Sequence, residues 1–123
     1  MLDLGGSVGQ EAQAGVTMEV DDNAQEVQIE VTSLGNSDKV DIKGLESSEI
    51  KSGESNLKGL GVGDSVTIGD SDNGADVDLQ AAYNARNSGS PTSISGTVTA
   101  VAIIQEDDTQ TQVASEDFDF DYS

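Results

Sequence analysis

Short runs of alternating apolar and polar residues constrain the fold of this chain more than any other feature. Residues 16–20 (VTMEV) place Val and Met on one side with Thr and Glu on the other, and residues 27–31 (VQIEV) repeat the pattern. Side chains of a β-strand point alternately to opposite faces of a sheet, so this period of two predicts half-buried strands. The polar residues 21–26 between them predict a hairpin. Residues 39–43 (KVDIK) alternate in the same way and predict a third strand.

Later parts of the chain continue the strand pattern. Residues 66–68 predict a short strand, and residues 77–83 predict another with Val77, Leu79, Ala81 and Tyr83 on one face. Residues 98–104 are apolar on both faces apart from Thr99, as expected of a central strand. Residues 116–122 (EDFDFDY) alternate strictly and hold three of the four aromatic residues. We expect this C-terminal segment to be a core strand.

The remaining middle segment, residues 44–59, is less regular. Its Leu45 and Ile50 fit either a short helical turn or an edge strand. With 123 residues, the chain has the length of one domain with a single modest core. Six or seven strands with turns about every 8–12 residues predict an all-β fold, an antiparallel β-sandwich of immunoglobulin-like type.

The charge balance restricts the partners. The chain has 24 Asp and Glu against five Lys and Arg, a formal net charge of −19. Binding to nucleic acid or to an anionic membrane requires clusters of Lys and Arg, so both partners are excluded. The acidity is compatible with disorder, a cation-binding site or a surface adapted to molar salt. Because the acids are spread along the chain and alternate with apolar residues, we interpret it as the surface of a halophile's protein, whose repulsion salt screens.

Catalytic side chains are scarce. The chain has no His and no Cys, so it lacks the most frequent general base, a common nucleophile and the usual transition-metal ligands. Paired carboxylates can hydrolyse glycosides, but 24 acids produce close pairs by chance. We therefore predict no catalysis and no cofactor, with a small carboxylate-dependent hydrolase as an alternative.

One acidic turn suggests calcium. Residues 69–78 (GDSDNGADVD) contain four carboxylates, the oxygen ligands that Ca²⁺ prefers. The spacing differs from that of an EF-hand loop, which has Gly at its sixth position and Glu at its twelfth. A solvated turn, with the Asn-Gly pair in the left-handed region, is the favoured interpretation. No metal site is predicted, and the weak candidates are Asp70, Asp72, Asp76 and Asp78.

The N-terminal segment carries a family resemblance. Residues 2–20 (LDLGGSVGQEAQAGVTMEV) resemble the part of haloarchaeal type IV pilins in which an apolar helix ends and a β-rich head begins. Leu2, Leu4, Gly5 and Gly6 match the end of the helix, and residues 7–14 match the linker of small residues and Gln or Glu. In that family, a prepilin peptidase removes a short leader that precedes the helix.

The resemblance implies a domain organisation and a function. Residues 1–14 are expected to be a linker after a missing N-terminal hydrophobic helix, and residues 15–123 a β-sandwich head domain. The implied function is that of a structural subunit of an extracellular pilus-like filament that attaches cells to surfaces. Its implied partners are other pilin subunits, bound through the missing helix, and cell or abiotic surfaces. Without that helix, we expect a soluble monomer.

Other functions stay open at the level of sequence. Within the same export system, the chain fits an archaellum component, either a filament subunit or a stator-like β-sandwich. Outside that system, it fits a secreted halophilic module that binds sugar or calcium.

Overall fold

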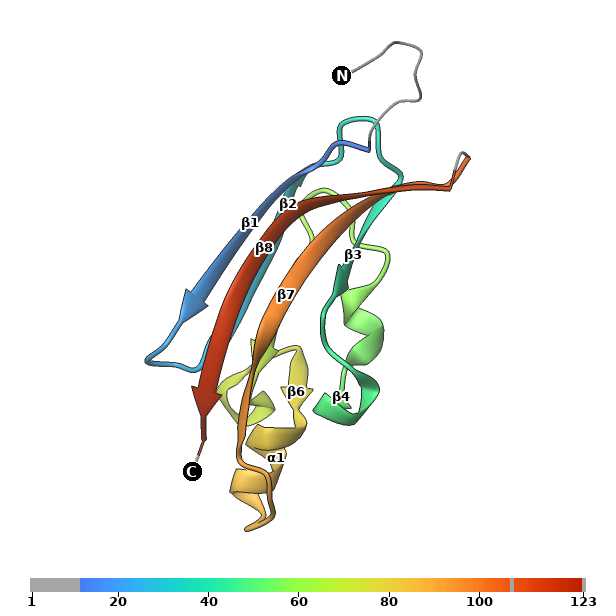
Figure 1. Cartoon of the computed structure of the whole chain (residues 1–123). Coiled ribbons are helices and arrows are strands. Elements are labelled where there is room, and N and C mark those ends of the chain that lie inside the picture. Colours follow the sequence, from blue (N-terminus) through green and yellow to red (C-terminus); the bar gives the residue numbers. More distant parts are fainter. Residues whose placement is uncertain (1–11, 107, 123) are drawn as a thin grey trace.

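The computed structural model describes residues 12–106 and 108–122, which fold into two facing β-sheets (Figure 1). In this part of the chain, one sheet has five strands in the order β1 (Gly15–Asp21), β2 (Glu26–Ser33), β5 (Ser65–Gly69), β6 (Val77–Leu79), β4 (Ile50–Ser52). The other has three strands in the order β3 (Lys39–Lys43), β7 (Ser93–Ile104), β8 (Thr109–Asp121). The predicted all-β sandwich is confirmed, with eight strands in the described residues rather than six or seven.

Strands β1 and β2 form the predicted antiparallel hairpin. Val16 pairs with Val31, and Met18 pairs with Ile29, so both apolar rows face the core. The inner side chains of β2 are buried, whereas those of β1 are half-buried, because β1 is the last strand of its sheet. The remaining neighbours are antiparallel except β5 and β6, which run parallel.

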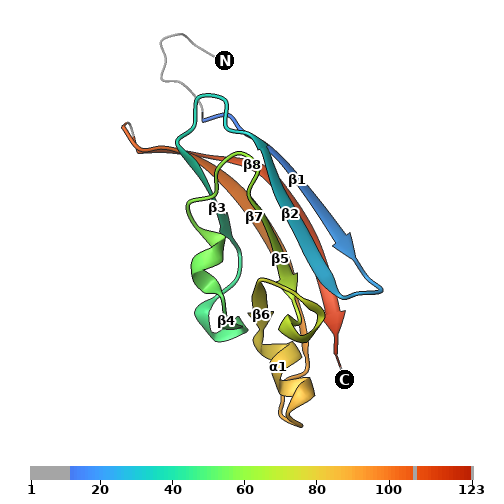
Figure 2. The same cartoon turned by 180° about the vertical axis from the view of Figure 1, so that it is seen from behind.

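Strands β7 and β8 form the longest hairpin, with paired residues from Ser93–Asp121 to Ile104–Thr109 (Figure 2). Phe118 and Phe120 of β8 are buried, and their ring centroids lie 5.2 Å apart. Tyr122 follows the end of β8 and places its ring edge-on to Phe120 at 6.2 Å. The prediction of a C-terminal core strand is confirmed.

The predicted strand at residues 77–83 is wrong in its second half. Strand β6 ends at Leu79, and helix α1 (Gln80–Arg86) begins at the next residue. Ala81 and Ala82 are both buried although they are neighbours in sequence, which a strand facing one core does not allow. Ala, Gln and Arg have high helix propensity, and no β-branched residue lies between positions 80 and 86 to oppose it.

The irregular segment 44–59 contains both of the structures considered for it. Short 3₁₀ helices η1 (Ser47–Glu49) and η2 (Glu54–Leu57) flank the edge strand β4. The segment begins at Gly44, which has a φ of 108°. A side chain at that position would collide with the carbonyl oxygen of Thr97 on β7, so glycine is needed for the chain to leave the sheet there.

The core lies between the two sheets and is built almost entirely from aliphatic side chains, with Phe118 and Phe120 as its aromatic members. Its largest fully buried residues are Phe120, Ile29, Ile68, Leu79, Val27, Val31, Val40, Val77 and Val98.

The described chain enters at the end of the sandwich that carries the β7–β8 turn, while β8 finishes at the opposite end (Figure 1). Ala12 is buried against Ala102 and Ile104, and its N–H donates to Thr111 Oγ1 at 3.2 Å. Residues 1–11, most of the predicted linker, lie outside the described residues. β1 begins at Gly15, where the head domain was predicted to start.

Candidate functional site

The four carboxylates of the acidic turn occupy different positions. Asp70 precedes the 3₁₀ helix η3 (Ser71–Asn73) and accepts a hydrogen bond from the Asp72 N–H at 3.0 Å. Asp78 lies on β6, is buried, and accepts from the Ser71 N–H at 3.2 Å. Asp76 is directed to β5 instead, where it accepts from the Thr67 N–H at 3.0 Å.

The guanidinium of Arg86 joins three of these carboxylates. Arg86 is the last residue of α1 and donates to Asp78 Oδ1 at 3.1 Å and Oδ2 at 2.9 Å. It also donates to Asp70 and lies 3.5 Å from Asp72 Oδ2. The structure places Arg86 at the end of a helix that returns it to the acidic turn.

The pKa values of Asp78 and Arg86 are shifted by their mutual contact. Burial alone would raise the pKa of Asp78, but hydrogen bonds from Arg86 and Ser71 outweigh it and lower the pKa below its ordinary value. The hydrogen bond to Asp78 likewise raises the pKa of Arg86, against the opposing effect of burial. Both shifts favour the charged forms of Asp78 and Arg86.

The Arg86 cluster, formed by Arg86, Asp70, Asp72 and Asp78, already contains a cation supplied by the chain itself. Within the described residues, no three or more His, Cys, Asp or Glu side chains are arranged to hold a metal ion. Chemically, the cluster ties η3, β6 and α1 together through charge-assisted hydrogen bonds.

Two tyrosines, Tyr83 and Tyr122, make further polar contacts in this part of the molecule. The Lys51 ammonium lies 4.2 Å from the centroid of the Tyr83 ring, and the Arg86 guanidinium lies 5.6 Å from it. The Tyr122 hydroxyl donates to the Gln25 carbonyl at 2.5 Å. Burial raises the pKa of Tyr122, and the nearby charges of Asp70, Glu26 and Asp78 add to the effect. Tyr122 is thereby fixed beside the β1–β2 turn.

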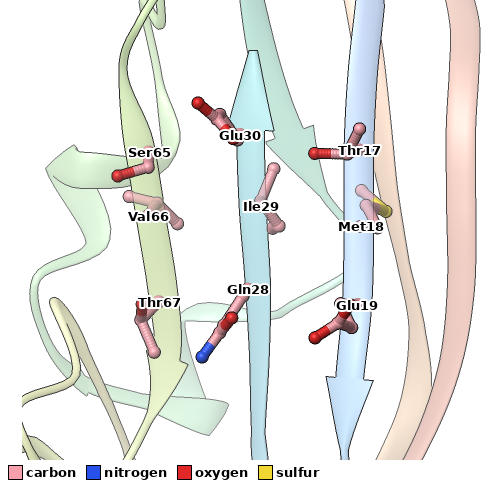
Figure 3. Close-up of a pocket in the computed structure, with 9 residues that line it drawn as sticks. All are labelled: Thr17, Met18, Glu19, Gln28, Ile29, Glu30, Ser65, Val66 and Thr67. Carbon is pink, nitrogen blue, oxygen red and sulfur yellow. The ribbon is translucent and has the colours of Figure 1, made fainter. Parts of the chain in front are cut away.

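A second feature is a hollow of about 300 Å³ on the outer face of the five-stranded sheet, across β1, β2 and β5 (Figure 3). The strand register aligns its outward side chains in two rows. One row is Thr17, Glu30 and Ser65, and the other is Glu19, Gln28 and Thr67. Between these rows lies a third, Met18, Ile29 and Val66, whose side chains face the core.

The outer-face hollow, defined by those two rows, offers hydroxyl, amide and carboxylate groups. The Gln28 amide donates to Glu26, two residues earlier on β2, at 2.9 Å. The lining includes neither a Lys, an Arg nor an aromatic ring. Such a surface suits ligands that present hydroxyl or ammonium groups and repels anions. The sequence analysis did not select these residues, because each is one of the ordinary polar positions of an alternating strand. Pairing residues 16–20 with residues 27–31 would have placed four of them on one face of the sheet.

Neither models of known protein families nor curated proteins match this sequence. Among the described residues, no helix has both the length and the apolar character needed to cross a bilayer. The function is therefore inferred from the sequence and the structure of the chain alone.

Proposed function

We propose that this chain is the globular head of a type IV pilin-like subunit, which forms an extracellular filament of a haloarchaeon and attaches cells to surfaces. The observation that carries the proposal is the resemblance of residues 2–20, which runs directly into the first strand of the sandwich. If the head is joined to a filament core through a linker at residues 1–14, the first strand of the head should begin directly after that linker, as β1 does at Gly15.

The placement of the chain ends supports the proposal. Ala12 is seated at one end of the sandwich, and the C-terminal end of β8 lies at the other (Figure 1). The described chain therefore enters the sandwich at the end opposite to the C-terminal end of β8, as expected of a head that is attached through its N-terminal segment.

The surface chemistry agrees with exposure along a filament. The outer sides of β1 and β8 carry acidic side chains at alternate positions, including Glu19, Asp117 and Asp119. A surface of this kind keeps the protein soluble, and salt screens the self-repulsion that would otherwise destabilise the fold.

Immunogold electron microscopy tests the proposal directly. Antibodies are raised against the folded protein and applied to cells of the source organism and to filaments sheared from them. We expect gold particles along filaments, and no label in a strain that lacks the gene. Label confined to the cytoplasm, or soluble protein in the medium with unlabelled filaments, would contradict the proposal.

The same deletion strain separates the two kinds of filament. Normal swimming with reduced attachment to glass is expected of a pilus subunit. Lost swimming with normal attachment would assign the chain to the archaellum instead.

A secreted sugar-binding module is the second candidate, favoured by the outer-face hollow with its six hydrogen-bonding side chains. A glycan array probed in high salt tests it. Binding that Gln28→Ala and Glu30→Ala abolish, and that the exposed control Glu54→Ala preserves, would favour this function. Absence of binding to any neutral glycan would remove it.

A further inference from the structure

Two strands close one side of the sandwich without pairing. β1 ends the five-stranded sheet and β8 ends the three-stranded sheet, and in the described chain no strand pairing joins them. They contact each other and lie side by side in both views (Figures 1 and 2). We call this boundary between Gly15–Asp21 and Thr109–Asp121 the β1–β8 seam.

Hydrogen bonds hold the seam near its two ends. At one end, the Ala12 N–H donates to Thr111 Oγ1 at 3.2 Å. At the other, the Gln25 side chain donates to the Asp121 carbonyl, and the Tyr122 hydroxyl donates to the Gln25 carbonyl at 2.5 Å. Between these ends, side-chain packing must hold the two strands together.

That packing is incomplete. Val16, Met18 and Val20 of β1 are only half-buried, as are Val113 and Ala114 of β8. Hydrophobic stabilisation is roughly proportional to the apolar area removed from water, so half-buried side chains stabilise the seam less than core residues would.

The two strands of the seam carry acidic side chains and no basic ones. All Lys and Arg residues of the chain lie between positions 39 and 86, so β1, β2, β7 and β8 contain none. Glu19 on β1 and Glu116 and Asp119 on β8 are exposed. Glu116 pairs in register with the buried Val98, which places it on the inner side of its strand at the open edge. Inward-pointing charges on edge strands are a known device against strand pairing.

Salt therefore affects two parts of the molecule differently. The Debye length falls from about 10 Å at 0.1 M salt to about 3 Å at 1 M, so repulsion between exposed acids is strong only in dilute buffer. The Arg86 cluster depends on salt much less, because the Asp78 side chain is only 4% exposed and its attraction to Arg86 is weakly screened.

We propose that the β1–β8 seam is a salt-controlled opening of the sandwich. As salt is lowered from the molar range, β1 and β8 separate along the seam while residues 65–86, held by the Arg86 cluster, stay folded. Opening gives solvent access to Met18 and to the inner face of β8. This inference rests on charge and strand pairing and is independent of the proposed filament function.

Thiol labelling measures the opening, because the chain has no cysteine and each variant carries one thiol. Met18→Cys and Ala114→Cys report on the two sides of the seam, and Val77→Cys reports on β6 beside Asp78. Rates with neutral iodoacetamide are measured between about 3 M and about 0.3 M KCl and divided by the rate in urea at the same salt concentration. We expect the two seam thiols to become reactive at higher salt than the thiol of Val77→Cys. Simultaneous reactivity of all three would overturn the proposal, because it would mean that the protein unfolds as one unit.

Two charge variants with equal net charge test the cause. In the Met18→Cys background, the seam variant carries Glu19→Gln, Glu116→Gln and Asp119→Asn, and the control carries Glu30→Gln, Glu54→Gln and Glu106→Gln; all six acids are exposed. The seam variant should lower the KCl midpoint of labelling by about twofold more than the control. Equal shifts in both variants would show that total charge, rather than the seam, controls opening.

Discussion

Arg86 and Asp78 form a two-point ion pair that joins the end of α1 to β6. Arg86 Nη1 lies 3.1 Å from Asp78 Oδ1, and Nη2 lies 2.9 Å from Oδ2. The Asp78 side chain is only 4% exposed, so removal of Arg86 would leave a carboxylate buried without its counter-ion. Such a charge costs far more free energy than the loss of an exposed salt bridge.

Arg86→Ala should therefore lower the free energy of unfolding by about 3–5 kcal/mol. Urea unfolding in about 3 M KCl measures it, because salt at that level screens surface charges but affects the buried pair little. Lys43→Ala is the matched control, since Lys43 is exposed, and it should change stability by less than about 1 kcal/mol. Arg86→Lys should fall between them, because it keeps the charge but loses the two-point geometry. Equal effects of Arg86→Ala and Lys43→Ala would contradict this role.

Tyr122 should make stability fall in alkaline solution. Burial raises the pKa of Tyr122 in the folded protein, so the unfolded chain releases this proton first, near its ordinary pKa of 10.0. Above that pH the unfolded state binds fewer protons than the folded state, and stability decreases with rising pH. Tyr122→Phe should cost about 1 kcal/mol at neutral pH through the lost hydrogen bond to Gln25. The stability of Tyr122→Phe should then decline less steeply with rising alkaline pH than that of the unmodified protein. Urea unfolding of both proteins at a series of alkaline pH values measures this. Parallel plots of the free energy of unfolding against pH would contradict the expectation.

The strands predicted correctly from the sequence are those in which the alternation of apolar and polar residues within the strand itself shows which face is buried. Residues 16–20 and 27–31 alternate because one face of each strand meets the core, and this pattern can be read without knowing the partner strand. The change from β6 to α1 at Leu79 was missed because Val77, Leu79, Ala81 and Tyr83 fit a period of two by coincidence. The adjacent pair Ala81–Ala82 and the neighbouring helix formers were the local signal for a helix.

The candidate sites depend on tertiary structure, so they were harder to predict from the sequence than the strands were. Asp70, Asp72 and Asp78 could be grouped from sequence, but their counter-ion is supplied by Arg86, which reaches them only because α1 reverses the chain direction after β6. The outer-face hollow requires the pairing of β2 with β5, which are separated by more than 30 residues in sequence. Long-range pairings of this kind have no local sequence signal.

Thermal stability should increase with salt. The net charge of −19 acts on a core of mostly aliphatic side chains, and screening removes the repulsion that this core must otherwise offset. Melting followed by circular dichroism should give a Tm that rises from dilute buffer to about 2 M KCl. The control variant Glu30→Gln, Glu54→Gln, Glu106→Gln should melt higher in dilute buffer and gain less from salt. A Tm that does not change with KCl would contradict the interpretation of a salt-adapted surface.

The aromatic pair of β8 should be indispensable for folding. Phe118 is buried with its ring against Gly96 of β7, and Phe120 is 1% exposed. Replacing a buried Phe by Ala costs about 3–5 kcal/mol, whereas a whole small domain has about 5–15 kcal/mol of stability. Phe118→Ala combined with Phe120→Ala should therefore unfold the protein even in high salt, while the exposed Asp119→Asn should leave it folded, as circular dichroism can show. Limited proteolysis gives an independent check: if residues 116–123 were removed readily and the remaining fragment kept its Tm, β8 would not contribute to the core in the way that its packing indicates.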